Sequence, residues 1–222
     1  MQRHLVIFAK EPRLGAVKTR LARDIGAAAS SHFYEETLRR LLRRVARDAP
    51  WRCWLAVTPD AFARAARRRW RFLPRDLAVV AQGRGDLGQR MARAFAALPP
   101  GPAVLVGSDI PAIARHHIAA AFAALGRHDA VFGPAEDGGY WLVGQRRLRP
   151  MPHLFRAVRW SGPHALADTL ANLAPGQRHA LVARLADIDD GAAYRRLGIA
   201  AAAEDSPRRH GERKAFAGTK KR

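Results

Sequence analysis

The chain has 222 residues, of which 39 are Lys or Arg and 19 are Asp or Glu, so its formal net charge is +20. This length suits one well-buried domain and is short for two. No apolar run approaches the roughly 20 residues of a transmembrane helix, and the apolar stretch at 5–9 is too short for a signal peptide. The single cysteine, Cys53, excludes an internal disulfide, so we expect a cytoplasmic protein.

The positive charge would draw the chain to polyanions such as nucleic acid, anionic lipid or phosphorylated substrates. Arginines cluster on expected helical faces at 39–40, 43–44 and 67–69. No basic patch is interleaved with aromatic residues at the spacing that nucleic-acid recognition uses. We therefore expect any nucleic-acid binding to be non-specific.

Short apolar runs alternate with helical patterns along the chain. A buried strand is expected at 5–9, followed by a glycine-containing loop and one long helical pattern from about 17 to 47. The next strand, 51–58, ends at a Thr-Pro-Asp turn whose Asp60 is expected to cap a helix at 61–70. Further strands are expected at 77–82, 103–106, 130–132, 140–143 and 185–188, and further helices at 87–98, 112–125, 164–173 and 192–197.

This alternation predicts an α/β fold with right-handed crossovers, in which helices cover both faces of a mostly parallel sheet in three layers. The strand at 140–143 is expected to run back along the edge of that sheet. From Ala200 the composition becomes small and charged, which predicts one domain at 1–199 and a basic, disordered tail at 200–222.

In an open α/β sheet, ligands bind outside the carboxyl ends of the strands. The loop after the first strand contains Lys10 and Gly15 and leads into a helix start with Lys18 and Arg20. Backbone N–H groups, the helix dipole and these cations would favour a bound phosphate there. A basic surface turn is the alternative, and the glycine spacing differs from that of a Walker loop.

The loop after the third strand contains Gly83, Gly85 and Gly88, with Asp86 placed to cap the next helix. Such a loop could close over the base or ribose of a nucleotide. A simple connection between strand and helix explains the glycines equally well, so this loop alone does not decide between the two readings.

Asp109 follows the expected strand at 103–106. A carboxylate at the exit of a buried strand carries a desolvation cost unless a cation or hydrogen-bond donors satisfy it. Mg²⁺ binds through one or two carboxylates together with substrate phosphates, which suits Asp109. The alternative is that Asp109, followed by Pro111, only caps the next helix.

The stretch 133–144 is the most unusual in the chain, because Glu136 and Asp137 stand directly before Gly138 and Gly139, and Tyr140 follows. Such glycines let the backbone approach a ligand or adopt positive φ, and adjacent carboxylates can hold a metal or move a proton. A β-hairpin with an acidic turn is the alternative.

Two later segments have the same ambiguity. Asp187, Asp189 and Asp190 offer a further carboxylate after the last expected strand. Trp160 and its neighbours at 161–163 could form part of an acceptor wall, or simply a turn with a packed tryptophan.

Four motifs in register resemble a known family: Phe8-Ala9-Lys10-Glu11-Pro12 with Gly15 and Val17-Lys18-Thr19-Arg20-Leu21; Asp86-Leu87-Gly88 with Arg90-Met91; Gly107-Ser108-Asp109 with Pro111; and Gly133-Pro134-Ala135 with Asp137-Gly138-Gly139-Tyr140. The resemblance spans 5–197 and is to the bacterial selenodomain-associated transferases. That family is similar to glycosyltransferases of the GT-A (nucleotide-diphospho-sugar transferase) fold. It is more distantly similar to molybdenum-cofactor and phospholactate guanylyltransferases.

The resemblance implies a role for each matched position. Lys10, Lys18 and Arg20 would hold donor phosphates. From the two glycine-containing loops themselves we expect Gly15, Gly85, Asp86 and Gly88 to bind the nucleotide or its phosphates. Asp109 would bind Mg²⁺ or Mn²⁺, and Asp137 would complete the metal or acceptor site. The acceptor would lie against Gly138, Gly139, Tyr140 and Trp160.

The chain departs from the family pattern at two points. Gly162 stands where the family usually has a threonine, so no hydroxyl role carries over there. Of the late Asp-x-Asp-Thr-Pro pattern only the acids, Asp187 and Asp189, are present.

We therefore expect a metal-dependent transferase with a nucleotide-activated donor, in which Asp137 and Lys18 are catalytic. The first choice is a glycosyltransferase that moves a sugar from a nucleotide-sugar to a small-molecule acceptor. The alternative is a nucleotidyltransferase that releases pyrophosphate from a nucleoside triphosphate. A remote third hypothesis is a basic nucleic-acid-binding protein.

Overall fold

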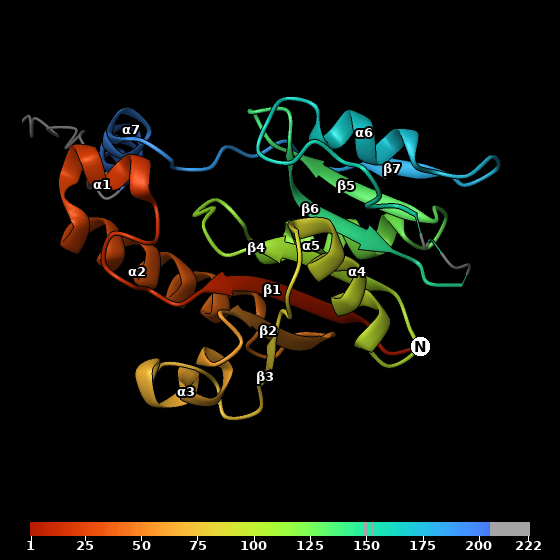
Figure 1. Ribbon diagram of the computed structural model, residues 1–222, viewed down its shortest axis with the longest axis horizontal. Coiled ribbons are helices and arrows are strands. Elements are labelled where there is room, and N and C mark those ends of the chain that lie inside the picture. The colour runs from red at the N-terminus through yellow and green to blue at the C-terminus, as the bar shows by residue number, and fades with distance from the viewer. Residues whose placement is uncertain (149–150, 152, 205–222) are drawn as a thin grey trace, which may run out of the picture.

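The computed structural model describes residues 1–148, 151 and 153–204, which fold into one sheet flanked by helices (Figure 1). The strands in this part of the chain are β1 (His4–Lys10), β2 (Arg52–Thr58), β3 (Ala78–Ala81), β4 (Ala103–Gly107), β5 (Ala130–Pro134), β6 (Tyr140–Gln145) and β7 (His179–Leu181). Its helices are α1 (Thr19–Ile25), α2 (Ala27–Val45), α3 (Phe62–Arg69), α4 (Leu87–Ala97), α5 (Arg115–Ala124), α6 (Ala165–Ala171) and α7 (Gly191–Glu204).

The sheet has the strand order β3-β2-β1-β4-β6-β5-β7. All neighbouring strands pair in parallel except β6, which is antiparallel to both β4 and β5. Ile7 of β1 lies opposite Leu55 of β2 on one side and Val106 of β4 on the other. Strands β2 and β3 thus follow on one side of β1 and β4 lies on its other side, so the strand order reverses between β1 and β4. Open α/β sheets bind ligands at such a topological switch point.

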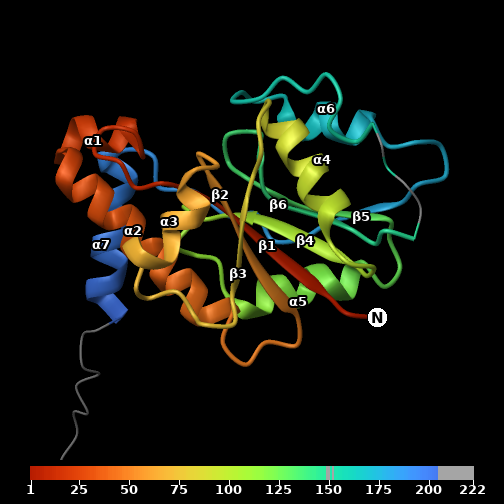
Figure 2. The ribbon, with the colours of Figure 1, turned by 60° about the horizontal axis from the view of Figure 1, so that its bottom comes forward.

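The two faces of the sheet are both buried, because β1 alternates its side chains between two cores. Leu5 and Ile7 pack with residues of α2, α3 and α5, whereas Val6 and Phe8 pack with residues of α4 and α6. Figure 2 shows α4 and α6 above the sheet and α5 below it. The predicted three-layer, mostly parallel α/β fold is thus confirmed.

Four local predictions were wrong. The helical pattern expected at 17–47 is two helices, because Gly26 between them takes a φ of 87° that ends α1 and starts α2. The β6 strand lies inside the sheet, between β4 and β5, and not along its edge. The strand expected at 185–188 is replaced by the earlier β7, and Leu185 forms only an isolated bridge with Ala135.

The fourth wrong prediction is the cap of α3. Helix α3 has no side-chain cap, and the carboxylate of Asp60 instead accepts a hydrogen bond of 2.9 Å from the backbone N–H of Gly83. This contact ties the end of β2 to the loop after β3, so Asp60 stabilises a connection between strands and not a helix start.

The end of the chain is described only in part. Helix α7 runs to Glu204, and the rest of the predicted tail, 205–222, lies outside the described residues. In the part of the chain that the structure describes, no helix combines the length and the apolar character needed to cross a membrane.

Candidate functional site

The site lies at the end of the sheet where the parallel strands β1, β4 and β5 have their carboxyl termini. The loop after β1 carries Lys18, the turn after β4 carries Asp109, and the turn after β5 carries Asp137. A fourth segment, between β7 and α7, brings Asp187 and Asp189 to the same end of the sheet. Lys18, predicted to bind phosphate, and Asp109, predicted to bind a metal, thus lie at the same end of the sheet.

Three carboxylates form a cluster at this end of the sheet. Asp109, Asp187 and Asp189 each offer an oxygen, and these oxygens all lie within 4.8 Å of one another. All three residues are half-buried. Oxygen ligands of this kind suit hard divalent cations such as Mg²⁺ and Mn²⁺, so the residues present fit a metal of that class.

Lys18 lies behind this cluster and is almost fully buried, with its side chain 4% exposed. Its Nζ is 3.0 Å from Oδ2 of Asp109 and 2.7 Å from Oδ1 of Asp189. Its backbone has φ 47° and ψ 49°, the left-handed conformation directly before α1. The Oγ of Ser30 donates a hydrogen bond of 3.1 Å to the backbone carbonyl of Lys18, so both the backbone and the ammonium group of Lys18 are held in place.

The charges of the cluster are only partly balanced. Burial acts to lower the pKa of Lys18, but Asp109 and Asp189 outweigh burial and raise it, so Lys18 stays an ammonium. Burial opposes ionisation of Asp189 too, yet its hydrogen bond and charge interaction with Lys18 lower its pKa. Burial, and then the charge of Asp189, raise the pKa of Asp187 to about 6. An additional cation would relieve this excess of negative charge.

A buried hydroxyl holds the two strand ends together beneath the cluster. The Oη of Tyr34 accepts a hydrogen bond of 2.7 Å from the N–H of Lys10 and donates to its carbonyl at 3.2 Å. It also lies 3.1 Å from Oγ of Ser108, the residue before Asp109. Burial raises the pKa of Tyr34 to about 12, so it remains a neutral phenol. Sequence reasoning missed Tyr34, whose only signal was a polar tip on the apolar face of a helix.

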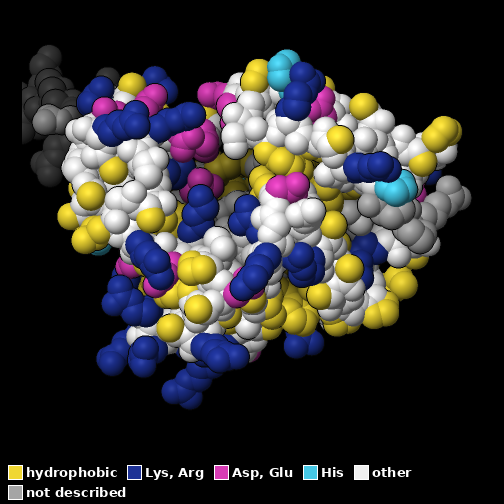
Figure 3. Space-filling view, viewed as in Figure 1, with side chains coloured by type: hydrophobic (Ala, Val, Ile, Leu, Met, Phe, Trp, Pro, Cys, Tyr) yellow, Lys and Arg dark blue, Asp and Glu magenta, His cyan; other side chains and the backbone are white. Residues whose placement is uncertain are grey.

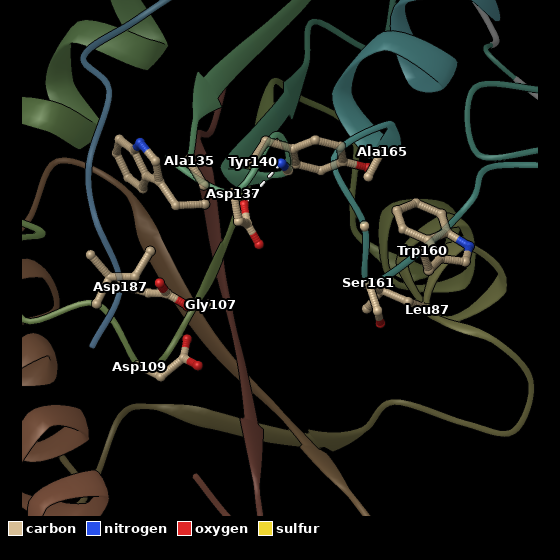
Figure 4. Close-up of a pocket in the computed structure, with 14 residues that line it drawn as sticks. Leu87, Gly107, Asp109, Ala135, Asp137, Tyr140, Trp160, Ser161, Ala165 and Asp187 are labelled. Carbon is tan, nitrogen blue, oxygen red and sulfur yellow. Dashed lines mark hydrogen bonds between the residues drawn. The ribbon is translucent and has the colours of Figure 1, made fainter. Parts of the chain in front are cut away.

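A cavity of about 350 Å³ opens beside the carboxylate cluster. Its acidic wall consists of Asp109, Asp137 and Asp187, and Tyr140 and Trp160 contribute to its aromatic wall (Figure 4). The rings of Tyr140 and Trp160 meet edge to face, 6.4 Å apart at an interplanar angle of 74°. The predicted acceptor residues Tyr140 and Trp160 thus line one space together with predicted metal ligands.

Asp137 lines this cavity but is not a member of the carboxylate cluster. Its Oδ1 accepts a hydrogen bond of 2.9 Å from the N–H of Gly139, which also lines the cavity. Gly138 has a φ of 83°, and a Cβ on it would overlap the backbone of Pro163. The glycine pair therefore shapes the turn and lets it pack against the 160–165 segment, while Asp137 is held at the cavity wall.

Four of the residues predicted to bind phosphate lie outside the cavity. Lys10, Gly15 and Arg20 are exposed, and Arg20 Nη1 lies 3.9 Å from Oδ2 of Asp189. Gly85 has a φ of 107°, which favours glycine at the turn before α4. None of these four residues lines the described cavity.

Asp86 and Gly88 have structural partners. The carboxylate of Asp86 accepts from the N–H of Gln89 at 2.8 Å, and the Gln89 side chain accepts from the N–H of Asp86, which caps α4 at its start. A Cβ on Gly88 would lie 2.8 Å from both the carbonyl of Phe155 and the ring of Trp160. Gly88 thus permits the close packing that places Trp160 at the cavity.

One family model matches the chain, across residues 41–162, and its description is "Uncharacterized protein conserved in bacteria (DUF2064)". No curated protein matches it. A solved structure from Desulfovibrio desulfuricans G20, titled a "putative nucleotide-diphospho-sugar transferase", is 26% identical and has a TM-score of 0.80. The match covers 95% of this chain and 91% of that one.

Two more distant structures share the fold. The 4-diphosphocytidyl-2C-methyl-D-erythritol synthase of Anaerococcus prevotii DSM 20548 is 12% identical, with a TM-score of 0.58 over 89% of this chain and 96% of that one. Rv0371C of Mycobacterium tuberculosis H37Rv, solved in complex with manganese, is 16% identical, with a TM-score of 0.52 over 89% of this chain and 98% of that one. At these identities the likeness concerns the fold alone.

Proposed function

We propose that this chain, which belongs to the DUF2064 family of bacterial proteins, is a metal-dependent glycosyltransferase that moves a sugar from a nucleotide-sugar to a small-molecule acceptor. The observation that carries the proposal is the carboxylate cluster at the β1/β4 switch point, with the buried Lys18 behind it and a cavity beside it. The likeness over 95% of the chain to the structure titled a "putative nucleotide-diphospho-sugar transferase" supports it.

The metal would be held by Asp109, Asp187 and Asp189. A bound Mg²⁺ or Mn²⁺ would neutralise the negative charge on the departing nucleoside diphosphate. The manganese complex of a protein with the same fold supports a divalent cation of this class. Asp137, which the resemblance implied as a metal ligand, has its Oδ1 engaged by Gly139 and serves better on the acceptor side.

The donor phosphates would lie over the loop between β1 and α1. Lys10 and Arg20 are exposed there, Arg20 at 3.9 Å from Asp189, and both could turn toward an anion, while Lys18 adds a fixed positive charge at the cluster. Positive groups that are already in place stabilise charge that develops on the leaving phosphate without reorganisation during the reaction.

Asp137 would act on the acceptor. The acceptor hydroxyl oxygen forms a bond to the anomeric carbon of the donor sugar, and the bond from that carbon to the diphosphate oxygen breaks, with its electron pair leaving on the diphosphate. The hydroxyl proton passes to the carboxylate of Asp137. A carboxylate held by a backbone N–H at the cavity wall is placed to orient or deprotonate such a hydroxyl.

A nucleotidyltransferase is the second candidate, and the three cations Lys10, Lys18 and Arg20 favour it. In that reaction an acceptor phosphate attacks the α-phosphate of a nucleoside triphosphate, the bond to the β-phosphate breaks, and pyrophosphate leaves. Its transition state carries more negative charge around the phosphates, which suits a cationic loop.

The test incubates the full chain with Mn²⁺ and panels of nucleotide-sugars and nucleoside triphosphates. We expect Mn²⁺-dependent release of nucleoside diphosphate from one nucleotide-sugar, and Asp109→Asn to reduce it at least a hundredfold. Asp48→Asn is the matched control, because Asp48 is exposed, has a φ of 47° that asparagine tolerates, and precedes β2, at the opposite end of the parallel strands from the site.

Two results would contradict the proposal. Pyrophosphate release from a nucleoside triphosphate would establish the nucleotidyltransferase instead. Salt-sensitive affinity for duplex DNA that persists in Asp109→Asn, with no nucleotide binding at all, would favour the nucleic-acid-binding hypothesis.

A further inference from the structure

The cavity beside the carboxylate cluster has an unusual composition for this chain. Its fourteen lining residues, all within the described part of the chain, include Asp109, Asp137 and Asp187 but no Lys, Arg or His. By contrast, 39 of the 222 residues of the chain are Lys or Arg. Figure 3 shows many of these basic side chains gathered over α3.

The nearest buried cation does not change the charge of the cavity wall. Lys18 is 4% exposed, and its Nζ is engaged by Asp109 and Asp189. Asp109 and Asp187 would be neutralised by a metal, which leaves Asp137 as a carboxylate facing the cavity. Away from the metal, a phosphate or carboxylate group on a ligand would therefore meet the carboxylate of Asp137 and no positive side chain among the lining residues, and buried charge without a partner is unfavourable.

The opposite wall is apolar. The rings of Trp160 and Tyr140 meet there edge to face at 74°, and Leu87 and Ala165 lie beside them. The Tyr140 Oη accepts a hydrogen bond of 3.4 Å from Oγ1 of Thr169. A ligand would therefore meet an apolar surface at Trp160, with Ser161 beside it, and the carboxylate of Asp137 on the other side (Figure 4).

We propose that this cavity binds the acceptor, and that the acceptor is an uncharged, hydroxyl-bearing ring such as a sugar or cyclitol without phosphate or carboxylate groups. The apolar C–H face of such a ring would lie on Trp160, and one of its hydroxyl groups would face Asp137. A concave site with an apolar wall and a few polar groups orients a ligand of this class. The inference rests on the proposed function, because an acceptor requires a donor.

The test measures binding of matched pairs to the full chain by isothermal titration calorimetry, with and without Mn²⁺ and UDP. The pairs are mannose with mannose 6-phosphate, and myo-inositol with its 1-phosphate. We expect the neutral member of at least one pair to bind at least tenfold more tightly than its phosphate ester. Trp160→Ala should weaken that binding at least tenfold. Trp160→Phe should stay within about threefold, and Trp54→Phe, outside the cavity, should leave it unchanged.

A second variant tests the charge argument without removing any contact. Gly162 lines the cavity, and a Cβ added to it would meet nothing within 4 Å. Gly162→Lys should therefore fold normally and shift the preference toward the phosphate ester by at least tenfold. Gly162→Gln, similar in length and uncharged, should not shift it.

The outcomes separate this inference from the proposed function. Mn²⁺-dependent binding of a nucleotide without binding of either neutral ring would overturn the inference alone, as would tighter binding of the phosphate esters to the unaltered protein. Failure to bind Mn²⁺ or any nucleotide would overturn the proposed function, whatever the rings do.

Discussion

Replacing Lys18 by methionine should make the stability of the protein depend on a divalent cation. The substitution keeps the length of the side chain and removes the ammonium that faces Asp109 and Asp189 at 3.0 and 2.7 Å. Removing one partner of a fully buried ion pair costs about 3–5 kcal/mol. The two carboxylates are 41% and 43% exposed, however, so water would recover part of that loss. We expect the free energy of unfolding to fall by about 1–3 kcal/mol in EDTA.

Mn²⁺ should reverse the effect, because the ammonium and the metal compete for the same carboxylates. Two unit charges 4 Å apart interact by about 4 kcal/mol at an effective dielectric constant of 20. Screening at this half-exposed site reduces the gain, and we expect the Mn²⁺ affinity of Lys18→Met to rise by roughly tenfold, which is about 1.4 kcal/mol. Saturation at 100 times the dissociation constant would then add about 2.7 kcal/mol of stability.

The assays are urea denaturation with EDTA or with Mn²⁺, and titration of free Mn²⁺ by electron paramagnetic resonance. Lys10→Met is the matched control, because Lys10 is exposed and has no ion pair in the described structure. The reasoning is refuted if Lys18→Met is as stable as the unaltered protein in EDTA, or if it binds Mn²⁺ more weakly.

Three further predictions concern Asp187, Gly138 and Cys53. Because burial and Asp189 raise the pKa of Asp187 from 3.8 to about 6, the metal-free native state binds the extra proton, and its stability should fall as pH rises from about 4 through 6. Asp187→Asn should make this fall in the free energy of unfolding smaller by about 1 kcal/mol, a figure reduced because Asp187 is partly exposed. The prediction is contradicted if the urea midpoint changes by the same amount between pH 4 and pH 7 in the variant and in the unaltered protein. Gly138→Ala, forced to a φ of 83° against Pro163, should cost about 1–3 kcal/mol by thermal unfolding, whereas Gly162→Ala in open space should cost under about 0.5. Burial raises the pKa of Cys53 to about 12, so iodoacetamide should modify it at pH 8 at least a hundredfold more slowly than in denaturant.

The central strands were predictable because their side chains are buried on both faces. The apolar run at 5–9 corresponds to β1 (His4–Lys10), whose first six residues are buried. The placement of β6 was not predictable in the same way. Its run Trp141-Leu142-Val143 indicates a strand, and the burial of both faces places that strand inside the sheet, but the alternation of elements alone does not say between which neighbours.

The short edge strand β7 gave little signal. Its three residues, His179–Leu181, are exposed or half-buried, so no hydrophobic pattern sets it apart from a loop. The broken helix was readable in principle, since Gly26 marks the break. A single glycine inside a helical pattern is often tolerated, however, and the sequence does not show that this one takes a positive φ.

The site was predictable where it follows strand ends and unpredictable where it depends on a loop. Asp109 directly follows β4, and Lys18 follows the loop after the neighbouring parallel strand β1, so topology brings both residues to the same end of the sheet, while the loop at 11–18 sets their final approach. Asp187 and Asp189 lie on an irregular segment, and no periodicity fixes where such a segment crosses the sheet edge. Their approach to Lys18 depends on tertiary contacts, including the bridge between Leu185 and Ala135 and the hydrogen bond from Gly191 to Asp24.

The ion pair between Lys18 and Asp189 joins residues 171 positions apart in the chain. During synthesis, at about 5–20 residues per second, the first partner would wait on the order of ten seconds for the second. The carboxylate cluster cannot exist on a nascent chain that ends before Asp187, even when β1 to β6 have already paired. A shortened protein that ends before this segment would keep most of its sheet and lack two of the three carboxylates. Completion of the cluster thus coincides with completion of nearly the whole described chain.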